Sequence, residues 1–427
     1  GKLVRVTLGE VFDVAVVLAI LMCSVMLFTG TGVSAIEISS DAACVLDFKT
    51  GEFYYEYNAD TMLAPASMTK LMTVYMIYSA MSEGKLTGDT MITADAEDEA
   101  ASVDPDATNV FLQNGTAYSV NDLLDAILVP SACAASAMAG KYLCGSEREF
   151  ARKMNETAAQ LGLSAYFEDA SGLSDANRIT ARSTALLAKM LIEKYPDILT
   201  HTSKPYIIFG TKRYNSTNHM LPGDSYAYTG VDGLKTGTTT LAGCCFTATA
   251  ESDGIRLISV TMKSDTSRLR FLDSTQLLDF GFNAAHWLYD NLLATDMRVF
   301  INGNEVPAFR YAGPGSALCI MAEDLKDYGF DLSWDNGTRT LTAVYGEQRE
   351  VSPIPMDMYR GYVKDTALFH VYRDSKINIK LNMGGNEYSF TNTFPLDGYT
   401  AVSADELAGM AKSSTWNGNE RALYIEL

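Results

Sequence analysis

The sequence predicts an α+β catalytic domain followed by a β-rich C-terminal region. Strand-like patterns at residues 44–56 and 231–263 enclose a centre of helical periodicity, and another helical pattern follows at 267–280. From about residue 297 onward, short strand-like runs alternate with polar turns. We therefore expect a catalytic domain over residues 36–292 and an accessory region over residues 293–427.

The composition is that of a foldable protein with an acidic surface. The 427 residues suffice for two or three domains, with 47% hydrophobic and 20% charged residues. The formal net charge of −19 repels phosphate backbones and anionic lipid. We therefore expect no nucleic-acid partner.

Residues 1–35 have the pattern of a secretory signal peptide. Lys2 and Arg5 form a basic start, an apolar run extends from Val14 to Phe28, and small residues end at Ala35. The run is shorter than the roughly 20 residues that span a membrane. We expect an exported protein that works outside the cell or on the outer face of the membrane or wall. An uncleaved anchor helix is the alternative.

The first strand-like runs, 44–48 and 52–56, flank Lys49-Thr50-Gly51 and predict a hairpin with a glycine-containing turn. A helix is expected to begin near Ser67. Apolar periodicity predicts four more helices in the centre. They are expected at residues 120–128, 134–143, 147–161 and 181–195.

The C-terminal region contains a weak internal repeat. The order short helix, Trp, polar turn, Arg and final strand appears first with Trp334 and Arg339 and again with Trp416 and Arg421. We predict two related small modules at about 297–346 and 368–427.

The segment Ser67-Met68-Thr69-Lys70 has the form S-x-x-K. In a helix Lys70 lies one turn after Ser67 on the same face, and the apolar residues that follow it favour a desolvated amine with a lowered pKa. Such an amine can act as the base for a serine nucleophile. A second S-x-x-K, Ser82 to Lys85, lies in a polar stretch and is expected to be solvated surface.

The segment Lys235-Thr236-Gly237 is expected to open the later pair of strands. Lys235 and Thr236 offer a cation and a hydroxyl group to a carboxylate. Gly237 lets a substrate approach the strand backbone closely. The earlier copy at Lys49 is assigned to the hairpin turn.

The order S-x-x-K, a central serine at Ser131 and K-T-G resembles that of the penicillin-recognising serine enzymes. The surrounding segments, 65–73 and 230–239, look like those of serine-type D-alanyl-D-alanine carboxypeptidases, which are penicillin-binding proteins. The similarity spans about Ala43 to Phe282. It implies the penicillin-recognising serine transpeptidase/β-lactamase-like fold for the catalytic domain.

The resemblance also implies roles for single residues. Ser67 would be acylated, Lys70 would be its base, and Ser131 would relay a proton to the leaving D-alanine. Further residues would bind substrate: Lys235 and Thr236 hold the terminal carboxylate, Gly237 gives access, and the N–H groups of Ser67 and Thr238 form the oxyanion hole. The implied partners are peptidoglycan stem peptides, with β-lactams as covalent inhibitors, and the chemistry needs no cofactor.

One position departs from the family pattern. The usual central motif is S-x-N, and here it is Ser131-Ala132-Cys133, whose thiol forms only weak hydrogen bonds. Two alternatives stay open: a β-lactamase, which shares the three motifs, and a penicillin-binding wall or sensor protein with little turnover, which Cys133 suggests. A measurement of D-alanine release from a stem peptide would distinguish these functions.

The remaining chemistry-bearing residues indicate no metal site. The four histidines are scattered, at His201, His219, His286 and His370, and the cysteines form no C-x-x-C pair. The C-terminal modules faintly resemble small N-terminal domains of copper amine oxidases. Copper is not expected, because His370 is the only histidine there, and cell-wall association is the preferred role.

Overall fold

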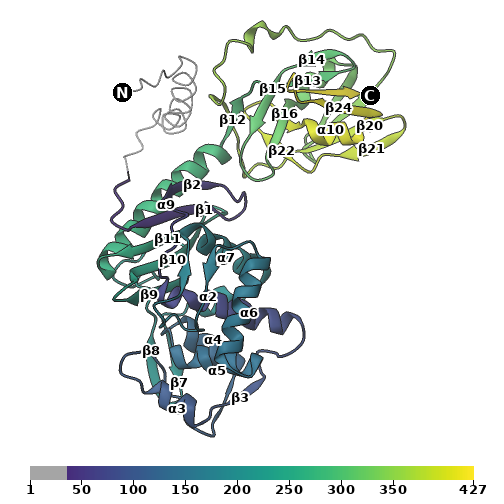
Figure 1. Cartoon of the computed structure of the whole chain (residues 1–427). Coiled ribbons are helices and arrows are strands. Elements are labelled where there is room, and N and C mark those ends of the chain that lie inside the picture. Colours follow the sequence, from purple (N-terminus) through teal and green to yellow (C-terminus); the bar gives the residue numbers. More distant parts are fainter. Residues whose placement is uncertain (1–35) are drawn as a thin grey trace, which may run out of the picture. The chain divides into compact units, whose positions relative to one another are not determined.

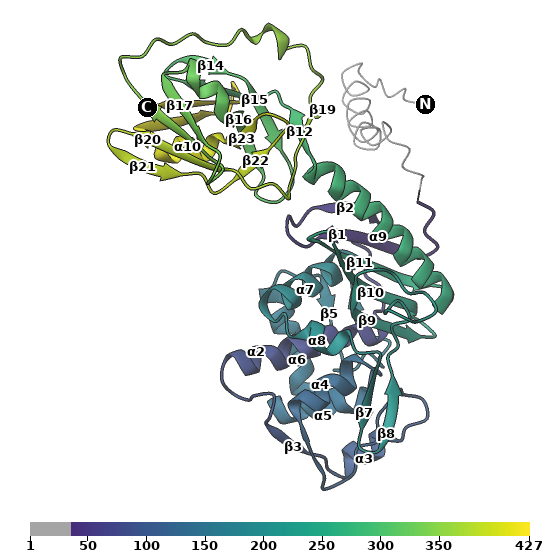
Figure 2. The same ribbon diagram turned by 180° about the vertical axis from the view of Figure 1, so that it is seen from behind.

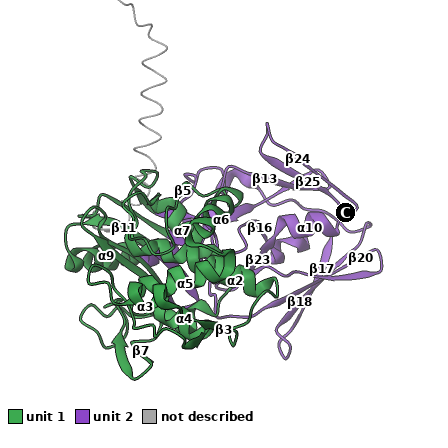
Figure 3. Cartoon of the chain, turned by 60° about the horizontal axis from the view of Figure 1, so that its bottom comes forward, with its two compact units in different colours: residues 1–45, 55–250, 259–280 green, residues 46–54, 251–258, 281–427 purple. Residues whose placement is uncertain are grey.

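The computed structural model of the protein describes residues 36–427, so the expected signal peptide lies outside the described residues. The chain forms two compact units, one made of residues up to 45, 55–250 and 259–280, the other of 46–54, 251–258 and 281–427 (Figure 3). Their boundary runs through several strands and the helix α9. Among residues 36–427 no helix is both long and apolar enough to cross a membrane.

A five-stranded sheet, in the order β2-β1-β11-β10-β9, carries the K-T-G motif (Figure 1). Its strands are β1 (Ala42–Asp47), β2 (Phe53–Tyr57), β9 (Val231–Thr239), β10 (Gly243–Ser252) and β11 (Ile255–Ser264). The β1–β2 hairpin is as predicted. Its Lys49-Thr50-Gly51 turn is held by Asp47 Oδ1, which accepts hydrogen bonds from the backbone N–H groups of Lys49 and Thr50.

Alternation along β10 explains how this sheet is covered on both faces. Phe246 packs edge-on against Phe271 of α9 (Ser267–Tyr289), with ring centroids 5.2 Å apart. The next residue, Thr247, donates a hydrogen bond to Met68 Sδ in the short 3₁₀ helix η1 (Ala66–Thr69). Hence α9 lies on one face of the sheet and the serine motif on the other (Figures 1 and 2).

The helical centre agrees with the predicted periodicity. Side-chain oxygens of Ser119, Ser146 and Thr180 accept hydrogen bonds at the N-termini of α4, α6 and α7 and so fix where these helices begin. The helices are α2 (Lys70–Ser82), α3 (Ala96–Ser102), α4 (Val120–Leu128), α5 (Cys133–Cys144), α6 (Glu147–Gln160), α7 (Ala181–Lys194) and α8 (Ile198–Thr202). Three two-stranded sheets connect them: β3 (Met91–Thr93) with β4 (Ala117–Ser119), β5 (Ala165–Tyr166) with β6 (Arg178–Ile179), and β7 (Tyr206–Phe209) with β8 (Lys212–Asn215).

Two expected helix limits were wrong. The α-helix begins at Lys70 rather than Ser67, because Ala66 adopts a left-handed φ of 50° and residues 66–69 form a tighter 3₁₀ turn. The helix expected at 267–280 continues to Tyr289. Its additional turns bury Ala285, Leu288 and Tyr289.

The C-terminal residues of the second unit form three sheets. A six-stranded sheet has the order β19-β12-β15-β16-β23-β22, and two four-stranded sheets have the orders β14-β13-β25-β24 and β17-β18-β20-β21. The strands are β12 (Asn291–Ala294), β13 (Arg298–Ile301), β14 (Asn304–Val306), β15 (Ala308–Tyr311), β16 (Ala317–Met321), β17 (Phe330–Asp335), β18 (Thr340–Tyr345), β19 (Ala367–His370), β20 (Asn378–Met383), β21 (Asn386–Ser389), β22 (Thr393–Pro395), β23 (Thr400–Ser403), β24 (Ser413–Asn417) and β25 (Ala422–Glu426). The short helices are η2 (Ala322–Asp327), η3 (Met356–Met358) and α10 (Ala404–Met410).

The repeated sequence adopts a repeated conformation. Trp334 pairs with Leu341 and Trp416 with Leu423 across equivalent hairpins, and Arg339 and Arg421 both have φ of 50° in the turns. The final hairpin of each copy pairs in parallel with the first hairpin of the other, through β18–β20 and β13–β25. These matches support the predicted modules, whose limits remain a prediction.

All predicted site residues belong to the first unit. We therefore expect a protein consisting of residues 36–292 to be acylated by a fluorescent penicillin at a rate close to that of the whole chain. Gel fluorescence would measure the rate, and a thermal melt would show whether the shortened protein is folded. A folded, soluble protein of this length that fails to acylate would show that the accessory region completes the site.

Candidate active site

The S-x-x-K motif forms a close serine–lysine pair. Ser67 is half-buried in η1, whereas Lys70, the first residue of α2, is fully buried. Lys70 Nζ lies 2.7 Å from Ser67 Oγ. Because the amine is shielded from bulk solvent and this close to the hydroxyl group, a proton can pass between the two side chains directly.

Lys70 Nζ has two further neighbours. It donates a hydrogen bond to the Ser171 carbonyl oxygen at 2.7 Å and lies 3.3 Å from Cys133 Sγ. Burial lowers the pKa of Lys70, and the nearby Cys133 opposes that change. The amine therefore loses its proton more readily than an exposed lysine does, and its nitrogen lies within reach of the Ser67 hydroxyl group.

Ser131 and Lys235 form a second buried pair beside the first. Ser131 precedes α5 with a left-handed φ of 70°, and Lys235 Nζ donates a hydrogen bond to its Oγ at 2.8 Å. Lys235 also donates to the Thr236 carbonyl oxygen. Burial, and then repulsion from Lys70, hold the pKa of Lys235 well below its usual range.

The K-T-G motif lies within β9, and not at the start of a strand pair as the sequence predicted. The strand begins four residues earlier because Val231 to Leu234 already pair with β10. At Gly237 the strand touches the nucleophile turn: an added Cβ would lie 2.7 Å from the Pro65 carbonyl oxygen and 2.8 Å from Ser67 N. The glycine is therefore required for this approach.

Two side chains at this site were missed by sequence reasoning. Arg270 of α9 is buried and donates hydrogen bonds to Thr238 Oγ1 at 2.8 Å and the Gly237 carbonyl oxygen at 3.1 Å. Thr217 Oγ1 lies 2.5 Å from Thr236 Oγ1. Neither belongs to a sequence motif, because both reach the strand from segments that are distant along the chain.

The predicted site residues therefore lie next to one another in the structure. Ser67, Lys70 and Cys133 are joined at one point, Ser131 and Lys235 at the next, and Thr236 to Thr238 follow along β9. The competing S-x-x-K is elsewhere: Lys85 is exposed and pairs with Glu83 at 2.5 Å. It is surface, as predicted.

The histidines and cysteines take no part in a metal cluster among the residues that the structure describes. His201 is buried and lies 2.6 Å from Asp125 Oδ1, whereas His219 pairs with Asp224. The six cysteines from Cys44 to Cys319 are free thiols.

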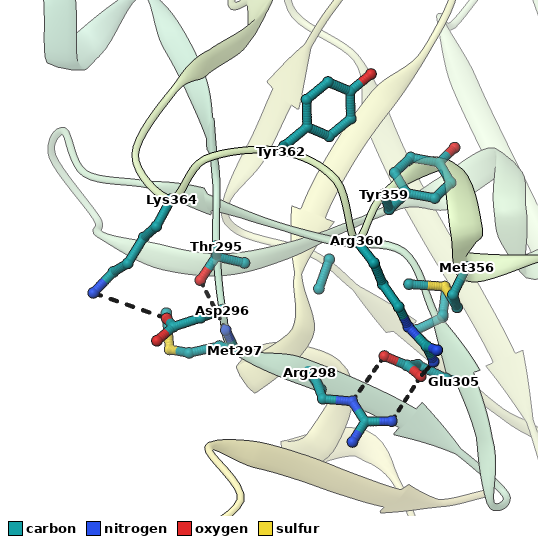
Figure 4. A pocket seen from close by; sticks show the side chains of 12 residues that line it. Thr295, Asp296, Met297, Arg298, Glu305, Met356, Tyr359, Arg360, Tyr362 and Lys364 are labelled. Atoms are coloured by element: carbon teal, nitrogen blue, oxygen red, sulfur yellow. Dashed lines mark hydrogen bonds and ion pairs between the residues drawn. The ribbon is translucent and has the colours of Figure 1, made fainter.

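A separate pocket of about 470 Å³ lies in the second unit (Figure 4). Its charged side chains already face one another: Arg298 and Arg360 bind Glu305, and Lys364 pairs with Asp296. This lining offers ion pairs and tyrosines rather than a serine next to a buried lysine. The geometry for acyl transfer is found on η1 and β9.

Comparison with known proteins agrees with this geometry. A family model described as D-alanyl-D-alanine carboxypeptidase matches residues 29–266, more than half of the chain. The chain belongs to this family of serine peptidases. The carboxypeptidase DacF of Bacillus subtilis is 32% identical over 308 residues, covering 70% of this chain and 77% of its own. DacC of Escherichia coli is 34% identical over 255 residues, covering 58% and 63%.

Solved structures show the same fold. Penicillin-binding protein D2 of Listeria monocytogenes, in its ampicillin-bound form, has a TM-score of 0.52 at 34% identity and covers 58% of this chain and all of its own. Penicillin-binding protein 5 of Haemophilus influenzae covers 84% of this chain and 97% of its own, with a TM-score of 0.56 at 22% identity. The predicted penicillin-recognising fold with a β-rich C-terminal region is confirmed.

We expect Gly237→Ala to slow acylation at least tenfold, because the new methyl group must push β9 away from the nucleophile turn. The second-order rate constant with a fluorescent penicillin measures this. Gly361→Ala serves as the control, since an added Cβ there meets nothing within 4 Å and this glycine does not have a positive φ. Equal rates for Gly237→Ala and the wild type would show that the close approach is not needed.

Proposed function

We propose that this carboxypeptidase is exported and removes the terminal D-alanine from peptidoglycan stem pentapeptides through an acyl-enzyme on Ser67. The observation that carries the proposal is the 2.7 Å contact between Ser67 Oγ and the fully buried Lys70 amine. A serine hydroxyl group is a weak nucleophile until an adjacent base takes its proton.

In the first step, neutral Lys70 takes the Ser67 proton while Oγ attacks the carbonyl carbon of the penultimate D-alanine. The backbone N–H groups of Ser67 and Thr238 would stabilise the oxyanion. Ser131, which contacts Lys235, would pass its proton to the nitrogen of the leaving D-alanine and take in return the proton that Lys70 received from Ser67, so that Lys70 is neutral again. Lys70 would then activate the water that releases the shortened peptide.

The substrate's terminal carboxylate would be held by Lys235 and Thr236. Both are buried, and Thr236 Oγ1 is already fixed by Thr217. An anion arriving beside Lys235 would raise the pKa of its amine and favour the charged form. Carboxylate binding and protonation of Lys235 would therefore support each other.

The competing functions are less well supported. A β-lactamase needs a group that promotes fast deacylation, commonly a glutamate. Glu168, which lies between the second and third motifs, is exposed and accepts a hydrogen bond from Tyr166 Oη. Cys133 keeps a low-turnover penicillin-binding role as the second candidate, since its thiol replaces the usual amide.

Two further elements of the proposal concern the surroundings of the enzyme. β-Lactams would acylate the same Ser67, and the similar penicillin-binding protein D2 of Listeria monocytogenes has been solved in an ampicillin-bound form. The accessory region, residues 293–427, would associate with the cell wall. Incubation with a defined pentapeptide stem, followed by an assay for free D-alanine, tests the activity as a whole.

We expect Ser67→Ala to abolish covalent labelling by a fluorescent penicillin, because no other hydroxyl group lies 2.7 Å from the Lys70 amine among the described residues. Ser82→Ala, the serine of the second S-x-x-K, should label normally. Mass spectrometry would identify the acylated peptide. Labelling that persists in Ser67→Ala, or that maps to Cys133, would refute the assignment.

We expect Cys133→Asn to raise kcat/KM for D-alanine release. An amide in place of the thiol would make a stronger hydrogen bond to Lys70, and a hydrogen bond made in the transition state contributes about 1–3 kcal/mol, or roughly tenfold to a hundredfold. The neighbouring Ala134 and Ala135 are small. An unchanged or lower rate in a variant that melts like the wild type would show that the thiol is no handicap.

A further inference from the structure

The loop between β5 and β6 carries an acidic residue for which the mechanism above has no role. Ser171 in this loop supplies the carbonyl oxygen that accepts a hydrogen bond from Lys70 Nζ at 2.7 Å. Asp169, two residues earlier, is half-buried. Its side chain does not contact Lys70 directly, so any effect on the base must pass through the loop or through the field of its charge.

The Asp169 carboxylate binds four donors of its own loop. Oδ1 accepts hydrogen bonds from the N–H groups of Ser171 at 3.2 Å and Gly172 at 2.7 Å, and from Asn177 Nδ2 at 3.1 Å. Oδ2 accepts from the N–H of Ser174 at 2.6 Å. Hydrogen bonds to an ionised carboxylate are short and strong, so this side chain fixes the turn that presents the Ser171 carbonyl group.

The same turn touches the nucleophile segment. Gly172 has a φ of +90°, and an added Cβ would lie 1.9 Å from the Ala66 carbonyl oxygen, one residue before Ser67. The Ala170 carbonyl oxygen accepts a hydrogen bond from Thr73 Oγ1 of α2 at 2.6 Å. A shift of this turn would therefore disturb the base and the nucleophile together.

The charge of Asp169 also acts on Lys70. Burial lowers the pKa of the Lys70 amine, while Cys133 and the Asp169 carboxylate raise it. Two more ionisable groups lie close to this arrangement. Lys235 faces Lys70 from β9, and Glu147 of α6 accepts a hydrogen bond from the Ala170 N–H.

We propose that Asp169 is a positioning residue for the general base: it holds the Ser171 carbonyl group against the Lys70 amine and places a negative charge close to that amine. This inference deepens the proposed function and rests on Lys70 being the base for Ser67.

The test compares three variants of the whole chain. Asp169→Asn keeps the shape of the side chain, removes its charge and keeps one acceptor oxygen. Asp169→Ala removes both acceptor oxygens and with them all four hydrogen bonds. Asp175→Asn removes an exposed charge from the same loop as a control. The measured quantity is the second-order rate constant of Ser67 acylation by a fluorescent penicillin from acidic to alkaline pH.

The two Asp169 variants should respond differently. In Asp169→Asn the rise of the rate with pH should shift to lower pH, because loss of the anion lowers the pKa of Lys70 and the neutral amine then persists in more acidic solution. In Asp169→Ala the rate should fall about tenfold or more at every pH, because the Ser171 carbonyl group is no longer fixed. Asp175→Asn should follow the wild-type profile.

An Asp169→Asn profile that coincides with those of the wild type and Asp175→Asn would overturn the inference. So would a folded Asp169→Ala protein that acylates at the wild-type rate. If Asp169→Ala does not fold, the profile of Asp169→Asn decides. Acylation does not require release of D-alanine, so a wild-type protein that acylates but releases none would count against the proposed turnover alone.

Discussion

The active site depends on one lysine amine that is shielded from solvent and lies close to one serine hydroxyl group. Lys70 is fully buried, and burial of an ammonium ion without compensation is costly, so the pKa of this amine is lowered. Its neighbours are all polar atoms that a neutral amine can use: Ser67 Oγ, the Ser171 carbonyl oxygen and Cys133 Sγ. The chemistry of the site follows from this single desolvated group.

Four separate parts of the chain meet at this site. The 3₁₀ turn at residues 66–69 brings Ser67, the start of α5 and the residues before it bring Cys133 and Ser131, the loop between β5 and β6 brings the Ser171 carbonyl group, and β9 brings Lys235. Close backbone contacts make this possible, and each requires a glycine: Gly237 against Ser67 N, and Gly172 against the Ala66 carbonyl oxygen. Side chains at these positions would hold β9 and the β5–β6 loop away from the nucleophile turn.

A second lysine so near the first has its own consequence. Lys235 is also buried, and Lys70 further disfavours its charge. The chain has a net charge of −19, so its overall charge does not attract an anionic substrate to the active site. Selectivity for a carboxylate would come from the local hydrogen-bond donors, Lys235 and Thr236, rather than from the overall charge.

The sequence by itself determined the elements and the main chemical groups. Periodicity predicted α4 to α7 and the β1–β2 hairpin, and the motif order singled out Ser67, Lys70, Ser131 and Lys235. These features are local, because a helix or a turn is set by residues within a few positions of each other. The surface location of the second S-x-x-K was also apparent from its polar surroundings.

Only the tertiary structure decided the rest. The α-helix α2 starts at Lys70, after a 3₁₀ turn that lies close to β9 at Gly237 and to the loop at Gly172. Arg270 and Thr217 reach β9 from 19 to 32 residues away, and Asp169 acts on Lys70 across 99 positions of sequence. The repeat pattern in the C-terminal sequence also does not indicate that a hairpin of each copy pairs with a hairpin of the other. Long-range packing sets these contacts, because burial and hydrogen-bond partners are properties of the folded chain and not of any local segment.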